Sequence, residues 1–284
     1  VPGRAYPVES HEAPKSTVVK EAVRLATDGK NILVFVPGKR EIGDTIDELE
    51  RLLPPEIRAE MDILPLHSKL SDAEQRLATH SSGRQKIVVS TNVAQTSLTI
   101  PDIDAVVDSG LERRQEMNEA GIQGLMMRPV SRADCMQRRG RAGRVKEGEY
   151  VLTRLNDDME YVPFIQRDEY PVAEILRTDT SRHVLRTAAI DIDFRSLDLF
   201  HRLDERVVDR AERYLVTLGA LKVNRNVTRL GIRMNSFPVR PSLGRMLAEA
   251  DQSSVEVRAS LAGIAATMEA GGLRYFGQDV GRRW

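Results

Sequence analysis

The sequence predicts an α/β fold, in which a parallel sheet covered by helices is followed by a smaller, mainly helical module. Up to about Leu155, short apolar runs alternate with stretches of helical period, which is typical of βαβ units. Runs that are apolar almost throughout indicate strands buried on both faces of a sheet. The strands expected on this basis are Ile32–Val36, Ile63–Leu66, Lys86–Ser90 and Ala105–Asp108.

Two further patterns complete this first region. Residues of helical period run from Glu41 to Leu53 and end at Pro54-Pro55. The segment Leu111–Met127 alternates polar and apolar residues on both sides of Asn118-Glu119-Ala120-Gly121, which predicts a β-hairpin.

The pattern changes after Leu155, where the acidic connector Asn156–Glu160 leads into amphipathic helical stretches. Gly219 is placed to end the second of these stretches. Two short apolar segments, Ala220–Val223 and Val227–Ile232, predict a two-stranded wing, so that helices and wing form a winged-helix module. The helical stretches are Val184–Ile190, Val207–Leu218 and Ser242–Met268.

The charge balance of the chain bears on how it could bind nucleic acid. Lysine and arginine together number 42, and so do aspartate and glutamate, so the formal net charge is zero. Binding to nucleic acid must therefore come from local basic patches. Cys135 is the only cysteine, which excludes an internal disulfide and fits a reducing cytoplasm. The sequence has no signal-peptide pattern and no apolar run near the ~20 residues of a membrane span, and its start at Val1-Pro2-Gly3 predicts a piece of a longer protein.

The basic run Gln137–Arg144 carries the strongest chemical signal. Arg141 and Arg144 are three residues apart, so on a helix they would share one face. Gly140 and Gly143 would let another surface approach the backbone closely. Paired guanidinium groups suit a phosphate, and an arginine finger offsets the charge that builds up in phosphoryl transfer. The alternatives are a solvated basic helix end or a patch for RNA phosphates.

A second motif, Ser90–Pro101, begins where an expected strand ends. Ligands of open α/β sheets gather at the carboxyl ends of strands. Small hydroxyl residues at such a place can bind a ribose-phosphate backbone without reading its bases. The alternative is a turn rich in threonine and serine.

These motifs resemble those of the DEAH/RHA superfamily-2 RNA helicases. Gln137–Arg144 matches their sixth motif, QRxGRAGR, and Ser90–Pro101 is similar to their fifth, TNxAETSLTIP. The resemblance covers nearly the whole chain and is greatest to bacterial HrpA-type members. Its other segments are Gly3–Val8, Ile32–Ile42, Leu64–Leu70, Glu169–Pro171, Glu174–Arg177, Gly219–Leu221 and Phe237–Pro241.

The resemblance implies a domain order and a set of functional residues. It implies a second RecA-like lobe over residues 1–156, with a P-loop-NTPase-type sheet that lacks the P-loop. A winged helix over 157–235 and the start of a helical ratchet domain over 236–284 follow. Gln137, Arg141 and Arg144 would be catalytic at the γ-phosphate and its attacking water, with Arg144 preferred as the finger. The residues implied at the nucleotide are Arg138, Gly140 and Ser97, and those implied along the RNA backbone are Thr91, Asn92, Gly38, Lys39 and Ser68.

The implied activity is ATP-dependent helicase or translocase movement, 3′ to 5′ along single-stranded RNA, with DNA as an alternative strand. ATP and Mg²⁺ would be held mainly by the first RecA-like lobe of the same protein, and the Leu111–Met127 hairpin would help to part strands. The main alternative is a nucleic-acid-binding module that kept the lobe and lost catalysis.

The sequence lacks the other half of such an active site. Phe35–Arg40 is no P-loop, because Leu33 stands where the first glycine is needed and Arg40 where a hydroxyl is needed. Asp168–Pro171 does not form an Asp-Glu-x-His motif, and the five histidines form no metal-ligand pattern. We therefore expect no metal site in this chain and no ATP hydrolysis by the chain alone.

Four residues or segments need their own interpretation. Gln95 stands where these helicases usually carry glutamate, which removes one charge. Ala78 stands where many of them have a phenylalanine that stacks on adenine, and alanine has no ring for stacking. Mixed charges in Val207–Leu218 favour a structural rather than a DNA-reading helix. We expect Cys135 to be a packed, inert thiol.

Overall fold

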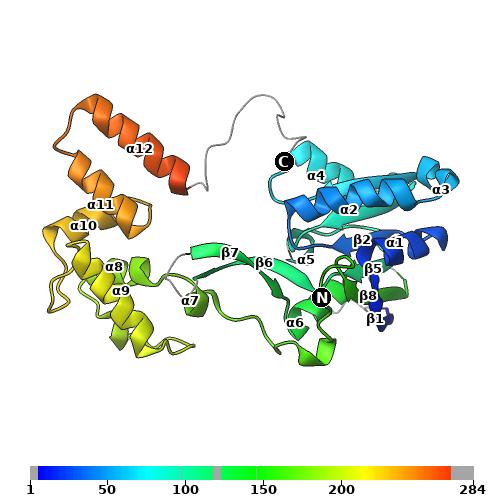
Figure 1. Cartoon of the computed structure of the whole chain (residues 1–284), viewed down its shortest axis with the longest axis horizontal. Helices are drawn as coiled ribbons and strands as arrows, with labels where there is room; N and C mark the ends of the chain where they lie inside the picture. Colours follow the sequence, from blue (N-terminus) through cyan, green and yellow to red (C-terminus); the bar gives the residue numbers. More distant parts are fainter. Residues whose placement is uncertain (1–5, 97, 118–122, 145, 270–284) are drawn as a thin grey trace. The chain divides into compact units, whose positions relative to one another are not determined.

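The computed structural model describes residues 6–96, 98–117, 123–144 and 146–269 (Figure 1). The chain divides into two compact units. The first contains Val1–Glu116 and Gly124–Val172, and the second contains Met117–Gln123 and Ala173–Trp284. No helix among the described residues is both long and apolar enough to cross a membrane.

A six-stranded parallel sheet forms the centre of the first unit and confirms the predicted fold class. Its strand order is β1-β8-β5-β2-β4-β3. The strands are β1 (Val8–Thr17), β2 (Ile32–Phe35), β3 (Met61–Leu66), β4 (Gln85–Ser90), β5 (Ala105–Asp108) and β8 (Gly148–Arg154). The four strands predicted from apolar runs are β2 to β5, and β1 and β8 pair with each other beyond β5.

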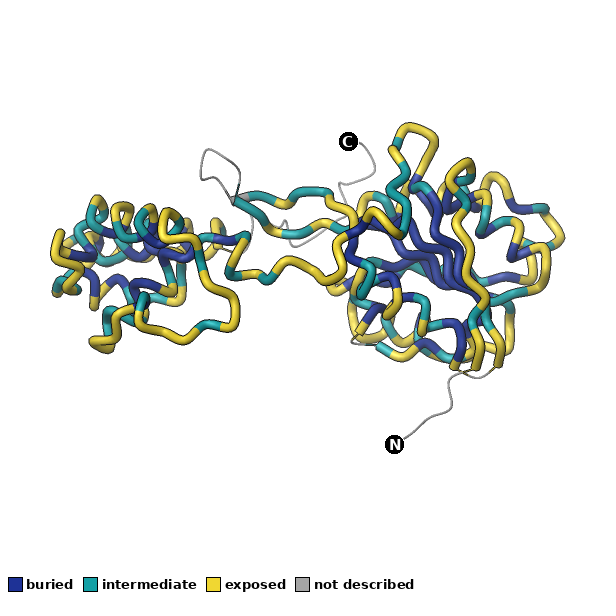
Figure 2. Tube along the Cα trace, turned by 90° about the horizontal axis from the view of Figure 1, so that it is seen from below, coloured by how far each residue is buried: buried dark blue, intermediate teal, exposed yellow. Residues whose placement is uncertain are grey.

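Each face of the sheet has its own apolar core, because successive side chains of a strand point to opposite faces. The helices of this unit are α1 (Val18–Thr27), α2 (Lys39–Leu52), α3 (Pro55–Glu60), α4 (Asp72–Thr79), α5 (Val93–Thr96) and α6 (Arg132–Arg139). Ile32 and Val34 of β2 pack in one core with α1 and α2. Leu33 and Phe35 pack in the other core with residues of α4, α5 and α6. The central strands β2, β4 and β5 are accordingly buried almost throughout (Figure 2), whereas the edge strand β1 is mostly exposed.

The pairing register brings the carboxyl ends of four strands to the same edge. Phe35, the last residue of β2, lies opposite Ser90 of β4 and Asp108 of β5, and Ser90 lies opposite Leu66 of β3. The segments that follow these strands therefore emerge side by side at what we call the carboxyl edge. This edge is where parallel α/β sheets bind ligands.

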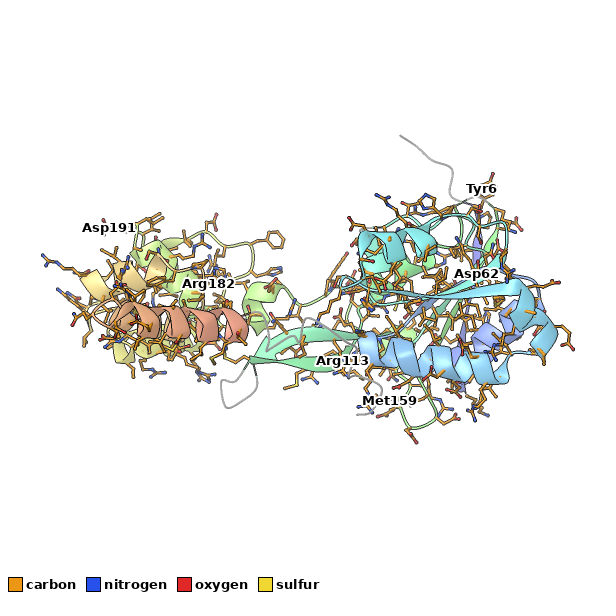
Figure 3. All side chains as sticks on the ribbon, turned by 90° about the horizontal axis from the view of Figure 1, so that it is seen from above. Tyr6, Asp62, Arg113, Met159, Arg182 and Asp191 are labelled. Carbon is orange, nitrogen blue, oxygen red and sulfur yellow. The ribbon has the colours of Figure 1, made fainter. Side chains whose placement is uncertain are left out.

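The predicted hairpin is present as a separate two-stranded sheet of β6 (Leu111–Met117) and β7 (Gln123–Pro129). Its predicted turn, at residues 118–121, lies outside the described residues. Arg113 on β6 donates to the Glu41 carboxylate of α2 at 2.7 Å, which ties the base of the hairpin to the carboxyl edge (Figure 3).

The first unit extends past residue 156, where the sequence places the domain boundary. The buried Arg167 donates to the carbonyl oxygens of Gly110 at 2.6 Å and Val130 at 3.1 Å. Gly110 has φ +65°, and a Cβ there would lie 2.2 Å from the Arg167 guanidinium. These contacts hold the connector on the first compact unit, which ends at Val172.

The second unit is mainly helical. Its helices are α7 (Glu174–Arg177), α8 (Ser181–Ala188), α9 (Glu205–Thr217), α10 (Arg229–Asn235), α11 (Pro241–Ala250) and α12 (Val255–Glu269). Leu185, Phe194, Leu215 and Met234 are among the buried side chains of its core. Gly219 follows α9 with φ +71°, as its predicted place at the helix end requires.

The predicted second strand of the wing, Val227–Ile232, is wrong. A single antiparallel bridge joins Leu221 to Val227, and the chain then enters α10. The Thr228 hydroxyl accepts from the Gly231 N–H at 2.9 Å and thus caps this helix. Local capping by Thr228 therefore outweighs the β-preference of the surrounding apolar residues.

Gly231 lies at a tight contact within this capped turn, which can be tested by adding a methyl group. A Cβ at Gly231 would lie 2.2 Å from the Ala220 carbonyl oxygen, so we expect Gly231→Ala to lower the free energy of unfolding by about 1–3 kcal/mol. A Cβ added at Gly263 on α12 would meet no atom within 4 Å, so Gly263→Ala should raise the free energy of unfolding by about 0.5–1 kcal/mol. Denaturant unfolding measures both values, and an equal gain at the two positions would contradict the tight contact.

Candidate functional site

The arginine motif lies where α6 ends, and only its first part is helical. The helix stops at Arg139, Gly140 is its C-cap, and Arg141–Arg144 form turns. The expectation that Arg141 and Arg144 share one face of a helix is therefore wrong. The helix ends here because the chain turns back to pair with the segment before β1, where the Tyr6 N–H donates to the Gly143 carbonyl oxygen at 2.9 Å.

Both arginines nevertheless lie against the fifth-motif segment. Arg141 donates to the carbonyl oxygen of Leu98 at 2.8 Å and also to that of Gln95. Arg144 donates to the Thr99 hydroxyl at 3.0 Å. The turn thus brings together the two guanidinium groups that the sequence predicts to act as a pair.

These two guanidinium groups lack a counter-ion among the described residues. Burial lowers the pKa of Arg141, and the adjacent charge of Arg144 lowers it further. Arg141 is half-buried and Arg144 is exposed. Two neighbouring cations bound only to carbonyl and hydroxyl oxygens form a candidate anion site.

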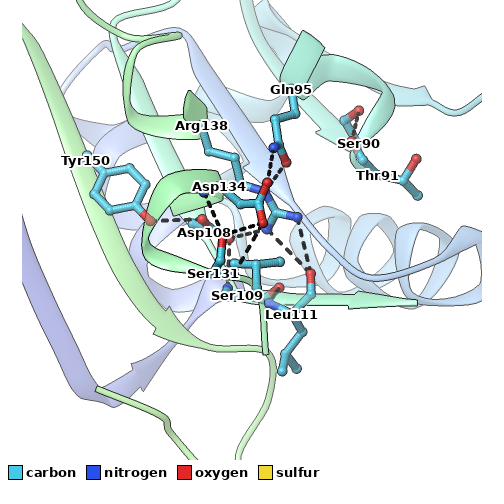
Figure 4. Close-up of polar contacts among 12 residues, drawn as sticks. Ser90, Thr91, Gln95, Asp108, Ser109, Leu111, Ser131, Asp134, Arg138 and Tyr150 are labelled. Carbon is cyan, nitrogen blue, oxygen red and sulfur yellow. Dashed lines mark hydrogen bonds and ion pairs between the residues drawn. The ribbon is translucent and has the colours of Figure 1, made fainter. Parts of the chain in front are cut away.

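Arg138, by contrast, is buried in the lobe and points toward Asp108 (Figure 4). It is 1% exposed, and it forms an ion pair with Asp108 at 2.7 Å. Burial acts to lower the pKa of Arg138, but the charge of Asp108 and the hydrogen bond to it raise it by more. Its burial argues against the predicted nucleotide contact and makes Arg138 an anchor of the motif.

Asp108 is the centre of this anchor. Its carboxylate accepts from the Tyr150 hydroxyl at 2.8 Å and from the Gly110 N–H at 2.7 Å, in addition to Arg138. The guanidinium of Arg138 also lies over the Phe35 ring, 4.9 Å from its centroid. The sequence analysis missed Asp108, although a carboxylate that ends a buried strand at the carboxyl edge was a signal for it.

Gln95 links the fifth motif to the sixth. Its side-chain oxygen accepts from Nε of Arg138 at 3.0 Å. Its side-chain nitrogen donates to Asp134 at 2.7 Å (Figure 4) and to Gln137 at 3.0 Å. The carboxylate of Asp134, which the sequence analysis also missed, caps α6 through Ser131 and fixes the start of the helix.

The two glycines of the motif differ in what they permit. A Cβ at Gly143 would lie 2.5 Å from the Tyr6 carbonyl oxygen, so glycine is required there for an approach within this chain. A Cβ at Gly140 would lie 3.4 Å from its nearest neighbour, the Gln137 carbonyl oxygen. Gly140 is exposed, so it is the glycine that leaves backbone open to another molecule.

The residues predicted along an RNA backbone all follow strands that end at the carboxyl edge. Gly38 and Lys39 follow β2, Ser68 follows β3, and Thr91 and Asn92 follow β4. Lys39, Ser68 and Asn92 are exposed, Thr91 is half-buried, and Gly38 is buried. The topology thus places these residues at one edge, as their predicted role requires.

Two predicted residues need separate comment. Ser97 lies outside the described residues. Ala78 is fully buried in the core between the sheet and α4, whereas its neighbour Leu77 is 65% exposed. Position 78 therefore faces the interior in this structure, and Leu77 is the side chain that α4 exposes at this point.

Cys135 is packed inside the first unit, as the sequence analysis expects. Cys135 is 1% exposed, and burial raises the pKa of its thiol to about 12. A thiol of this kind is packed and poorly nucleophilic. No group of three or more His, Cys, Asp or Glu residues within the described residues could hold a metal ion.

The anchor can be tested by removing its negative charge. Asp108→Asn leaves the buried Arg138 cation without a counter-ion, so we expect the free energy of unfolding to fall by about 3–5 kcal/mol. Asp62 forms a partly exposed ion pair with Arg84 at 2.9 Å, and Asp62→Asn is the matched control, with an expected loss of about 1 kcal/mol or less. Denaturant unfolding compares the two, and similar losses would show that burial adds nothing to the Asp108 pair.

Comparison with known proteins identifies the domains of this chain. Residues 14–146 match the model of the helicase conserved C-terminal domain, and residues 211–239 match that of the helicase-associated domain HA2, a winged helix. The ATP-dependent RNA helicase HrpA of Escherichia coli K12 is 34% identical over 275 residues, which cover 89% of this chain and 20% of the relative. The HrpA homolog of Haemophilus influenzae is 34% identical over 269 residues, with 88% and 20% coverage.

Solved structures give the same result. The crystal structure of the Escherichia coli DEAH/RHA helicase HrpB aligns with a TM-score of 0.85 at 27% identity, over 98% of this chain and 35% of that chain. A structure of the Escherichia coli DExH-box NTPase HrpB aligns with a TM-score of 0.82, also at 27% identity, over 98% and 34%. The chain spans about a fifth of the length of the curated relatives it matches. With its helicase C-terminal domain and helicase-associated segment, this chain belongs to the DEAH/RHA helicase family.

Proposed function

We propose that this chain is the second motor lobe of an ATP-dependent RNA helicase or translocase that moves 3′ to 5′ along a single strand. One observation carries the proposal. Arg141 and Arg144 lie side by side on the turn after α6, with no counter-ion among the described residues. A triphosphate held by another lobe would supply the missing negative charge.

The bonding of the two arginines favours Arg144 as the finger. Arg144 is exposed and is held by one hydroxyl, that of Thr99, so little is lost when its guanidinium moves. Arg141 is half-buried and is held by two backbone carbonyl oxygens. We assign to Arg144 the role of offsetting the negative charge that builds up on the transferred phosphoryl group. Arg141 would make a phosphate contact that needs little movement.

The rest of the nucleotide site would come from the first RecA-like lobe. Bound Mg²⁺ would be held mainly by that lobe and would neutralise charge on the phosphates. Gln137 is exposed beside this turn and would contact the γ-phosphate region, together with the open backbone at Gly140. This chain alone would then bind nucleotide weakly and hydrolyse none.

RNA would follow the carboxyl edge of the sheet. Lys39 supplies an exposed cation, and Ser68, Thr91 and Asn92 supply small polar groups beside it. Such groups bind phosphate and sugar without reading bases. The zero net charge of the chain fits binding that depends on this local edge.

The finger assignment is tested in the protein that carries both lobes. Arg144→Ala should lower the kcat of RNA-stimulated ATP hydrolysis by roughly 10³-fold, because it removes transition-state charge compensation. Arg51→Ala is the control: it removes an exposed arginine at the carboxyl end of α2, away from the arginine motif in the sequence, and should leave kcat unchanged. Hydrolysis within a few-fold of the unchanged protein after Arg144→Ala would sink the assignment, and hydrolysis by the isolated chain would contradict the need for the first lobe.

The RNA edge is tested by the salt dependence of binding. Lys39→Ala should weaken binding of single-stranded RNA and lower the slope of log K against log salt by about 0.7, the value for one phosphate contact. Lys146 is an exposed lysine paired with Asp104 at 2.8 Å, near the amino end of β8. Lys146→Ala changes the net charge equally, so an equal loss of affinity in both variants would show that Lys39 makes no specific contact.

A further inference from the structure

The amide group of Gln95 has a fixed direction, because its neighbours differ in what they can donate. An arginine side chain only donates hydrogen bonds, and Nε of Arg138 lies 3.0 Å from the Gln95 side-chain oxygen. Arg138 is itself fixed by the buried pair with Asp108. The oxygen of Gln95 must therefore face Arg138, and its NH₂ group must face the other way.

The direction of Gln95 determines the direction of Gln137. The NH₂ group of Gln95 has two hydrogens, and its nitrogen lies 2.7 Å from a carboxylate oxygen of Asp134 and 3.0 Å from the side-chain oxygen of Gln137. Asp134 can only accept, and Gln137 offers its oxygen as the second acceptor. The NH₂ group of Gln137 is then the end left free on an exposed side chain.

We propose that Gln95 is a positioning residue that turns the NH₂ group of Gln137 outward, so that Gln137 meets a bound phosphate as a hydrogen-bond donor. The nucleotide end of this proposal rests on the proposed function, whereas the chain of hydrogen bonds does not. In this role Gln137 donates to a phosphoryl oxygen, and its own oxygen is occupied and does not orient the attacking water.

Asp134 explains why this position carries an amide. One oxygen of Asp134 accepts from the hydroxyl of Ser131 at 2.6 Å and from its N–H at 3.3 Å, and the other faces Gln95. A glutamate at position 95 would place two carboxylates in contact. It would also have no hydrogen to give Gln137, which would have to turn its NH₂ group inward.

The direction of Gln137 can be measured on this chain without nucleotide, by NMR of its side-chain NH₂ groups. In the unchanged chain, we expect the NH₂ protons of Gln95 to exchange slowly and those of Gln137 to exchange at the rate of exposed amides. In Gln95→Glu, the NH₂ protons of Gln137 should become protected and shift. Protected Gln137 protons in the unchanged chain, or no change in Gln95→Glu, would overturn the proposal.

A double variant separates orientation from stability in the two-lobe protein. Gln95→Glu should lower both Tm and the kcat of ATP hydrolysis, the latter by roughly tenfold or more, with KM little changed. Adding Asp134→Asn restores an amide–carboxylate pair and keeps an oxygen for Ser131, so Tm should recover. Because Gln137 remains turned inward, kcat should stay low. Recovery of kcat together with Tm would reduce Gln95 to a structural role and refute the proposal.

A matched control uses the same change elsewhere in the lobe. Gln85 donates through its NH₂ group to the carbonyl oxygens of Ala26 at 2.8 Å and Lys30 at 3.0 Å, at the amino end of β4. Gln85→Glu should lower Tm and leave kcat unchanged, and an equal loss of kcat there would assign the effect of Gln95→Glu to stability. If Arg144→Ala keeps its ATPase while the NMR result holds, the proposed function fails and the orientation of Gln137 stands.

Discussion

The buried ion pair between Arg138 and Asp108 is the constraint on which the arrangement of the site depends. It joins the end of β5 to α6 at 2.7 Å, with Arg138 only 1% exposed. Burying two charges costs several kcal/mol for each ion unless their geometry and hydrogen bonds compensate. Tyr150 and the Gly110 N–H complete the bonding of Asp108, so the pair tolerates one position of α6. The position of α6 in turn fixes where the following turn, with Arg141 and Arg144, begins.

Arg138, Arg141 and Arg144 of the motif differ in burial, and therefore in how freely their guanidinium groups can move. Arg138 is fixed by a carboxylate inside the lobe, Arg141 is half-buried against two carbonyl oxygens, and Arg144 is exposed on one hydroxyl. From Arg138 to Arg141, a bond between two charged groups is replaced by weaker bonds to neutral carbonyl oxygens. From Arg141 to Arg144, two such acceptors are reduced to one. The same residue type thus has three roles in one motif: Arg138 anchors it, Arg141 is partly held, and Arg144 is a mobile cation. The difference in burial distinguishes them.

Sequence alone predicted β2 to β5 and the hairpin, because apolar runs and alternation mark them, but it did not predict β1 and β8, whose sequences mix polar and apolar residues. It could not predict the partner of Arg138, since Asp108 lies 30 residues away along the chain. It placed Arg141 and Arg144 on a helix because their spacing fits one, whereas the contact between Gly143 and Tyr6 ends helical structure first. The second strand of the wing was wrong for a different, local reason, because the Thr228 hydroxyl caps a helix there. Contacts between distant parts of the chain decided the first two cases, and local capping decided the third.

The same short segment connects the two parts of the proposed site. Thr91 and Asn92 at the carboxyl edge directly precede α5, which carries Gln95, and the carbonyl oxygens of Gln95 and Leu98 hold Arg141. A phosphate that competes for Arg141 removes hydrogen-bond donors from this segment, and its polar backbone then needs other partners. On the proposed function, nucleotide and RNA therefore act on one segment of about ten residues, so their coupling needs no long pathway through the lobe. The reciprocal also follows: RNA that fixes Thr91 and Asn92 changes how firmly Arg141 is held.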